Sequence, residues 1–164
     1  MRRCRPRVAT KGYVNPLAHA HVTGERIDQG VDYAGTGALT ALGAARVTKV
    51  STAATGWPGA FIEYRLSQGP NAGCFVYYAE GVTPDHGLHA GQSLRAGQRV
   101  ATIIPGWATG IELGWGAGIH NETYAARTGD WTAGDDYGSI ATRAGRTFSA
   151  LIGALGGPRG KDEG

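Results

Sequence analysis

The feature that most constrains this chain is a series of short apolar runs separated by turns that contain glycine and proline. Between residues 30 and 116 such runs recur about every ten residues. Residues 60–66 alternate apolar and polar side chains, and residues 74–80 are rich in aromatic and β-branched residues. Because Gly69 and Pro70 punctuate the segment between them, the two runs predict an antiparallel hairpin.

Further apolar runs extend this β-rich pattern along the chain. They are residues 30–34, 45–50, 100–104 and 109–115. Their spacing predicts an all-β fold, mainly antiparallel, in the form of a small sandwich or barrel. The 28 glycines follow no Gly-X-Y period, so they exclude collagen and instead suit many tight turns.

The end of the chain follows a different period. Phe148, Leu151, Ile152 and Leu155 are spaced as i, i+3, i+4 and i+7, which is the apolar stripe of an amphipathic helix. We therefore expect a short C-terminal helix over residues 142–154 that packs on the β domain.

The 164 residues are enough for one domain with a buried core. We divide them into a basic N-terminal arm (1–25), a β domain (26–118), and a loop, short helix and polar tail (119–164). The net charge is +3, and much of the positive charge lies near the two ends. We expect a solvated, poorly ordered arm, and the alternative is contact with an anionic polymer. Nucleic acid is not favoured as that polymer, because no aromatic residues interleave with the basic cluster.

Other features bear on where the chain works. Cys4 lies in the basic arm, and we expect Cys74 to be a small buried hydrophobe rather than one end of a disulfide. The first seven residues have the charge of a signal peptide, but no apolar stretch follows them. We expect neither a Sec signal nor a membrane span, which needs about 18 apolar residues, and the location stays open.

Three segments carry a resemblance to a known family. They are residues 28–34 (DQGVDYA), 76–80 (VYYAE) and 110–113 (GIEL), with a repeated Gly-Gln pattern at 91–101. In this order they resemble the lysostaphin-type zinc endopeptidases, which cut peptide cross-bridges in peptidoglycan. The resemblance implies a lysostaphin-peptidase-like β domain, a duplicated hybrid motif, over residues 26–118. The chain is also similar to uncharacterised proteins of high-GC Gram-positive bacteria and their phages that share its altered site.

Acidic residues stand where that family keeps its metal ligands. The resemblance places Asp28, Asp32 and Glu112 at the three ligand positions, and Glu80 and Gly110 at two histidine positions. Zinc in proteins prefers imidazole or thiolate ligands, so we expect no zinc here. An all-carboxylate set suits a hard divalent cation such as magnesium, calcium or manganese.

Four carboxyl groups in one groove would alter one another's ionisation. Like charges at close range raise the pKa of at least one of them. A protonated acid beside an ionised carboxylate can hydrolyse a glycan, and we expect Glu80 and Glu112 to be the acid and the nucleophile or base. Asp28 and Asp32 would orient them, position substrate or hold a cation. This predicts a peptidoglycan hydrolase-like domain that uses carboxylates in place of zinc, on glycan or peptide.

Aromatic residues are candidates for binding the polymer. Trp57 and Trp107 occupy loop contexts, Tyr78 lies in the tyrosine-rich run, and exposed rings stack well on sugars. The expected partner is peptidoglycan or another wall polymer, with virion or secretion-assembly proteins as further candidates. Delivery to the wall without a Sec signal would depend on a phage particle, lysis or a larger assembly.

A second interpretation requires no catalysis. In it, the chain is a non-catalytic wall-binding module or a phage-virion structural module that keeps the peptidase fold and has lost its chemistry. Asp28 and Asp32 then serve turns and backbone amides, while Glu80 and Glu112 face solvent.

Overall fold

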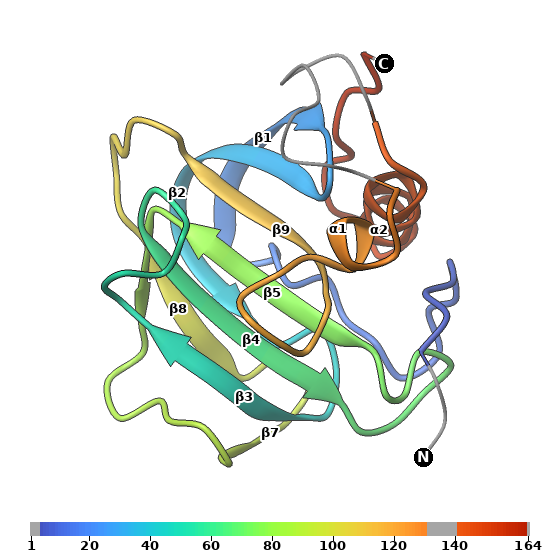
Figure 1. The fold of residues 1–164 in the computed structure, drawn as a ribbon, viewed down its shortest axis with the longest axis horizontal. Coiled ribbons are helices and arrows are strands. Elements are labelled where there is room, and N and C mark those ends of the chain that lie inside the picture. Colours follow the sequence, from blue (N-terminus) through green and yellow to red (C-terminus); the bar gives the residue numbers. More distant parts are fainter. Residues whose placement is uncertain (1–3, 131–140, 164) are drawn as a thin grey trace.

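A computed structural model describes residues 4–130 and 141–163 of the chain. The described residues form a strongly curved antiparallel sheet with two helices beside each other at one edge (Figure 1). The strands are β1 Ala20–Ile27, β2 Val31–Thr40, β3 Ala45–Ser51, β4 Ala60–Leu66, β5 Phe75–Glu80, β6 Val82–Pro84, β7 Ser93–Leu94, β8 Arg99–Ile103 and β9 Ile111–Gly116. The helices are α1 Tyr124–Arg127 and α2 Arg143–Ala154.

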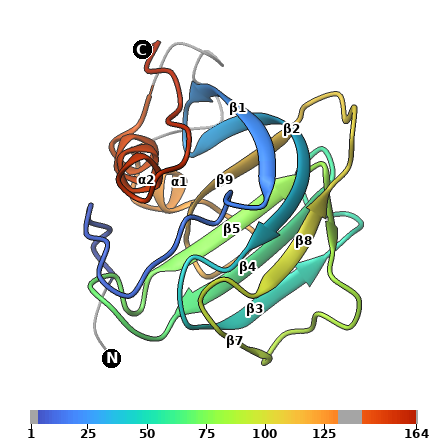
Figure 2. The same cartoon turned by 180° about the vertical axis from the view of Figure 1, so that it is seen from behind.

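The strands lie in the order β6-β8-β2-β9-β5-β4-β3-β7, and β1 pairs with β2 beside this path. Strand β2 has three partners: it pairs with β1 along most of its length, with β9 at residues 31–33 and with β8 at residues 38–40. This change of partners bends the sheet into a half-barrel, which Figure 2 shows from behind. The predicted all-β antiparallel fold with a short C-terminal helix is confirmed.

The expected hairpin is formed by β4 and β5, which pair from Ala60↔Glu80 to Arg65↔Phe75. The rings of Tyr64 and Tyr78 pack edge-to-face in the core, with their centroids 5.4 Å apart. Helix α2 covers one edge of this core, because Phe148 packs edge-on against Trp115 at 5.2 Å. The predicted helix therefore packs on the sheet as expected.

Strand β2 continues beyond the run that predicted it. The pattern ended at Gly35, yet the strand extends to Thr40 because glycine permits a close approach to β1. Gly37 has φ +116°, and a Cβ atom there would lie 2.6 Å from the Cα atom of Ala20. Sequence reasoning read these glycines as a strand end, and it also missed β1, whose alternation is weak.

The N-terminal segment differs from the solvated arm that we expected. Tyr13 and Leu17 are buried in the main core, and β1 begins at Ala20. Arg7 exchanges two backbone–side chain hydrogen bonds with Asn71, both 2.9 Å long. Residues 4–25 are therefore folded into the β domain rather than detached from it.

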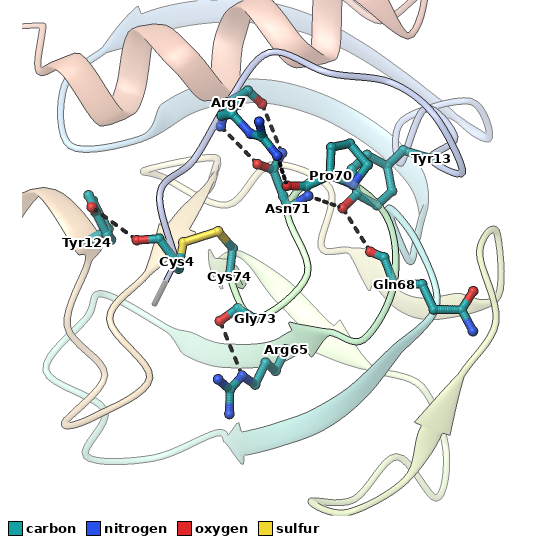
Figure 3. The surroundings of a disulfide bond; sticks show 10 residues. All are labelled: Cys4, Arg7, Tyr13, Arg65, Gln68, Pro70, Asn71, Gly73, Cys74 and Tyr124. Atoms are coloured by element: carbon teal, nitrogen blue, oxygen red, sulfur yellow. Dashed lines mark hydrogen bonds between the residues drawn. A yellow bond between two sulfur atoms is a disulfide. The ribbon is translucent and has the colours of Figure 1, made fainter. Parts of the chain in front are cut away.

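The expectation that the cysteines stay unpaired is wrong. Cys4 and Cys74 form a disulfide with their Cα atoms 4.7 Å apart, across 70 positions of sequence (Figure 3). The reason is tertiary: the loop between β4 and β5 folds back on the N-terminal segment, where the hydroxyl of Tyr13 accepts a hydrogen bond from the Asn71 amide at 2.7 Å. Cys74 is also fully buried, as predicted.

Neither helix of the described segments combines the length and apolar character that crossing a membrane requires.

Candidate functional site

The four predicted acids line one cavity of about 640 Å³. Asp32 lies on β2 directly opposite Glu112 on β9, so their side chains rise from neighbouring strands on the same face of the sheet. Glu80 ends β5, and Asp28 lies just before β2. The sheet thus gathers four carboxyl groups that are far apart in sequence.

Asp28 is fixed by both the sheet and helix α2. Its Oδ1 accepts a hydrogen bond from the Gly30 amide at 3.2 Å, as the second interpretation predicts for a turn residue. Its carbonyl oxygen accepts a hydrogen bond of 2.6 Å from the hydroxyl of Thr142, which caps the N-terminus of α2. The helix therefore anchors the backbone that carries this acid.

Glu112 is the most deeply placed of the four acids, with 3% of its surface exposed. The hydroxyl of Tyr77 donates a hydrogen bond of 2.6 Å to its Oε2. The phenol ring of Tyr77 has room because the neighbouring positions are Gly30 and Gly114; a Cβ atom at Gly114 would lie 2.8 Å from the hydroxyl. Tyr77 was not predicted as a site residue.

Arg26 supplies positive charge to this cluster. Its guanidinium lies 3.4 Å from Asp28 and 3.7 Å from Asp32, and its buried Nε has no hydrogen-bond partner among the described residues. Sequence reasoning missed Arg26, although its place two residues before Asp28 on an extended segment could have indicated a shared face.

Burial raises the pKa of each of the four predicted acids. For Asp32, burial and the nearby charge of Asp28 raise the pKa to about 7. Burial, with the charges of Asp28 and Asp32, raises the pKa of Glu112 well above its ordinary value. Glu112 and Asp32 are hydrogen-bonded to each other, and Glu112 is the partner that holds the proton. Because the pKa of Asp32 is about 7, the cluster contains an acid and a carboxylate side by side once Asp32 loses its proton near neutral pH.

This ionisation predicts that the chain becomes less stable as pH rises. Asp32 has an ordinary pKa of 3.8, so between that pH and about 7 the folded state binds more protons than the unfolded state. The contribution of Asp32 to the free energy of unfolding must then fall across this window and level off above it. Asp32→Asn should remove this loss. The free energy of unfolding of the variant, relative to that of wild type, should be higher at pH 8 than at pH 5 by about 1 kcal/mol or more.

Urea unfolding at the two pH values measures this effect. Asp85→Asn is the control, because Asp85 lies outside the cavity and pairs with Arg99. Equal pH dependence in wild type and Asp32→Asn would contradict the expectation.

Glu80 reaches the cavity through an unusual backbone conformation. Its φ is +80°, in the left-handed region that favours glycine. In a regular strand it would share a face with Tyr78, which points into the core, so the left-handed residue redirects its side chain toward the cavity. Burial raises the pKa of Glu80, while a hydrogen bond from Thr109 lowers it.

Glu80→Gly should stabilise the fold relative to Glu80→Ala by about 1 kcal/mol, because glycine adopts positive φ without steric cost. Both variants remove the buried carboxyl, so their difference isolates the backbone strain. Urea unfolding at one pH measures it, and equal stabilities would show that position 80 stores no strain. Such strain at a cavity residue is a mark of functional sites.

The predicted aromatic residues divide into three cases. Trp57 lines the cavity and packs against Tyr77 with ring centroids 5.4 Å apart. Trp107 lies outside the lining at the cavity rim, 39% exposed, and its Nε1 donates to the carbonyl of Pro58 at 2.8 Å. Tyr78 is fully buried, donates to the carbonyl of Thr40 and does not line the cavity, so the structure does not bring it to the site as predicted. Tyr77 is equally buried but contacts Glu112 through its hydroxyl.

The donor set does not fit zinc. Asp28, Asp32 and Glu112 can bring ligand oxygens within 4.8 Å of one another, without any histidine or cysteine in the group. Zinc in proteins favours nitrogen and sulfur donors, whereas carboxylate oxygens favour harder ions. Arg26 already provides a cation to two of these acids. A hard divalent cation at this place stays a prediction.

The half-barrel sheet has a lysostaphin-like peptidase fold. Lysostaphin itself, in its NMR solution structure, is similar over 94% of this chain and 59% of its own, with a TM-score of 0.54 and 10% identity. A crystal structure of a zinc-containing peptidase from Vibrio cholerae is similar over 74% of this chain and 38% of its own, with a TM-score of 0.42 and 16% identity. This chain thus spans less than two thirds of either protein, and the likeness shows the fold alone.

No family model and no curated protein matches the sequence.

Proposed function

We propose that this chain hydrolyses a peptidoglycan-type wall polymer with a pair of carboxyl groups in place of a zinc ion. One observation carries the proposal: Asp32 and Glu112 lie directly opposite each other on neighbouring strands, and both line an open cavity. The lysostaphin-like fold supports a wall polymer as the substrate.

The pair has the parts that water-mediated hydrolysis requires. Ionised Asp32 takes a proton from a water molecule while the water oxygen attacks the carbonyl carbon of the substrate. Protonated Glu112 provides the acid of the pair, whose proton passes to the departing nitrogen. Asp32 then carries the proton gained from water, and its return to Glu112 restores the starting state.

The other polar groups position this pair. Tyr77 fixes Oε2 of Glu112 through its hydroxyl. Arg26 contacts Asp32 and offers positive charge to the oxygen that becomes negative in the transition state. Glu80 and Asp28 complete the polar wall of the cavity.

This pairing revises the roles expected for Glu80 and Glu112 and favours peptide over glycan cleavage. A glycoside hydrolase keeps its two carboxyl groups about 5 to 10 Å apart, with the sugar or a water between them. Carboxyls that share a proton are in direct contact, which suits attack on an amide carbonyl. Glycan cleavage would require Glu80 as the second acid.

Gly110 supports a chemistry without imidazole. Gly110 stands where the lysostaphin-type endopeptidases keep a histidine. Its φ is +65°, and a Cβ atom there would lie 2.5 Å from the carbonyl oxygen of Tyr33. A histidine side chain would therefore require a shift of the backbone.

One observation favours the non-catalytic alternative. Arg26 forms ion pairs with Asp28 and Asp32, and a neutralised acid cluster can be purely structural. Trp57 and Trp107 would then bind the wall without any bond being cut.

The test uses purified Gram-positive cell wall in excess EDTA. We expect the turbid suspension to clear and free amino groups to accumulate, because carboxyl chemistry needs no metal ion. New reducing ends in their place would move the activity to the glycan strands. Sedimentation with the wall but no clearing would establish the binding module, and clearing that EDTA abolishes and a metal ion restores would refute the metal-independent mechanism.

A further inference from the structure

A second hollow of about 560 Å³ lies on the other side of helix α1 from the acid cavity. Its lining includes Arg5, Arg65 and Arg127, together with Tyr124 and Phe75, and we call it the arginine hollow. The lining, which consists entirely of described residues, contains no aspartate or glutamate. Three guanidinium groups around one depression indicate a site for an anion.

The backbone that carries Arg5 and the side chain of Arg65 are both held in place. The disulfide fixes Cys4 next to Arg5, and the hydrogen bonds between Arg7 and Asn71 fix the chain two residues further on. Figure 3 shows Tyr124 and Arg65 beside the disulfide. The Nε of Arg65 donates to the Gly73 carbonyl at 3.2 Å, which leaves its remaining donors for a ligand.

The positive charge of the hollow is only partly balanced. Arg127 has a carboxylate neighbour, Glu122, at 3.5 Å. Within residues 4–130 and 141–163, Arg5 and Arg65 form no ion pair. Guanidinium groups match phosphate oxygens with two parallel hydrogen bonds, so a chain of phosphates would satisfy them well.

We propose that the arginine hollow binds the phosphate groups of an anionic, phosphodiester-linked wall polymer. Bases of a nucleic acid would find no open ring to stack on, because Tyr124 is half-buried and Arg65 lies 5.1 Å above the centre of the Phe75 ring. Phosphate binding stands without the proposed function; only the preference for a wall polymer rests on it.

The position of α1 connects the two sites. Thr123 and Ala126 face the acid cavity, whereas Tyr124 and Arg127 face the arginine hollow. An α-helix is about 10 Å across, so one wall strand that passes beside α1 can occupy both places at once. The hollow would then retain the phosphate-bearing polymer while the cavity holds the bond to be cut.

The test compares wild type with Arg5→Gln/Arg127→Gln by sedimentation with three probes. These are Gram-positive wall that carries its phosphodiester polymer, the same wall stripped of that polymer, and single-stranded DNA of matched phosphate content. Lys11→Gln/Arg95→Gln is the matched control, because it removes two exposed positive charges that line neither site. Arg5→Lys/Arg127→Lys keeps the charge but removes the planar guanidinium fork.

We expect the glutamine variant to lose at least about tenfold in affinity for the phosphate-bearing wall, equivalent to about 1.4 kcal/mol. The slope of log affinity against log salt concentration should also become shallower by about 0.7 for each lost phosphate contact. The lysine variant should keep the salt dependence with weaker binding. Unchanged affinity of the glutamine variant, or equal loss in the control, would overturn the proposal.

Two further outcomes have defined meanings. If wild type binds stripped wall as tightly as phosphate-bearing wall, the proposal is overturned. If it binds DNA more tightly than phosphate-bearing wall, the ligand is a nucleic acid instead of a wall polymer. Hydrolysis is read separately on stripped wall, where the glutamine variant should clear as fast as wild type. Failure of clearing in every protein, with the affinity difference retained, would refute the proposed function alone.

Discussion

Glu112→Gln is expected to reduce hydrolysis of cell wall by about 10³-fold while leaving the fold intact. A glutamine amide can accept the hydrogen bond from Tyr77 and donate one to Asp32, as protonated Glu112 does. It cannot release a proton to the departing group, so the acid of the pair is lost. Free amino groups released per unit time from purified wall measure the rate, and circular dichroism measures the fold.

Glu63→Gln is the matched control for this prediction. Glu63 is another buried glutamate, 3% exposed, but it lies outside the acid cavity on β4. Its two oxygens accept hydrogen bonds from Thr48 at 2.8 Å and from the Gly118 amide at 3.2 Å. Because a glutamine can accept only one of these, Glu63→Gln should lower stability by about 1 to 2 kcal/mol and leave the rate unchanged.

The two variants therefore separate chemistry from packing. If Glu112→Gln clears wall at the wild-type rate, the carboxyl pair is structural and the proposed mechanism is wrong.

Removal of the disulfide is expected to have the largest effect on stability. Cys4→Ala/Cys74→Ala should lower the free energy of unfolding by about 4 kcal/mol, because the bond closes a long segment, with its ends 70 positions apart, in the unfolded chain. For a chain of this size that loss corresponds to a fall of about 10 °C in Tm. Thermal unfolding followed by circular dichroism measures it.

Reductant provides the control for the disulfide. It should lower the Tm of wild type to that of the double variant and leave the double variant unchanged. A double variant as stable as wild type would show that the hydrogen bonds between Arg7 and Asn71 already hold the N-terminal segment without the cross-link.

Elements with a strong local pattern could be predicted from sequence. Strand β4 and helix α2 each repeat their apolar residues at the period of one structure, and β5 is rich in aromatic and β-branched residues, so local information was sufficient. Strand β1 could not be found in this way, because its own alternation is weak and it is placed by pairing with β2, which approaches closely at Gly35 and Gly37.

The acids of the candidate site and their convergence on one groove were predicted, but their polar neighbours Tyr77 and Arg26 were not. Residue types at family positions indicated Asp28, Asp32, Glu80 and Glu112, and the structure places all four on one cavity. The choice of Tyr78 in place of Tyr77 failed because strand alternation breaks at the left-handed residue Glu80, a backbone angle that no residue pattern revealed.

Contacts between distant segments were the hardest to foresee. Cys4 and Cys74 are 70 positions apart, and Tyr77 meets Glu112 across 35 positions because β5 pairs with β9. Such proximity depends on the whole topology rather than on any local signal.

The bond between Thr142 and Asp28 has a consequence for how the molecule transmits motion. This hydrogen bond joins the N-terminal end of α2 to the backbone of Asp28, just before β2, with no flexible loop between the two bonded groups. Gly145 in the same turn packs so tightly that a Cβ atom there would lie 2.5 Å from the carbonyl oxygen of Asp28. Any tilt of helix α2 therefore moves the backbone of Asp28 and, with it, one wall of the acid cavity.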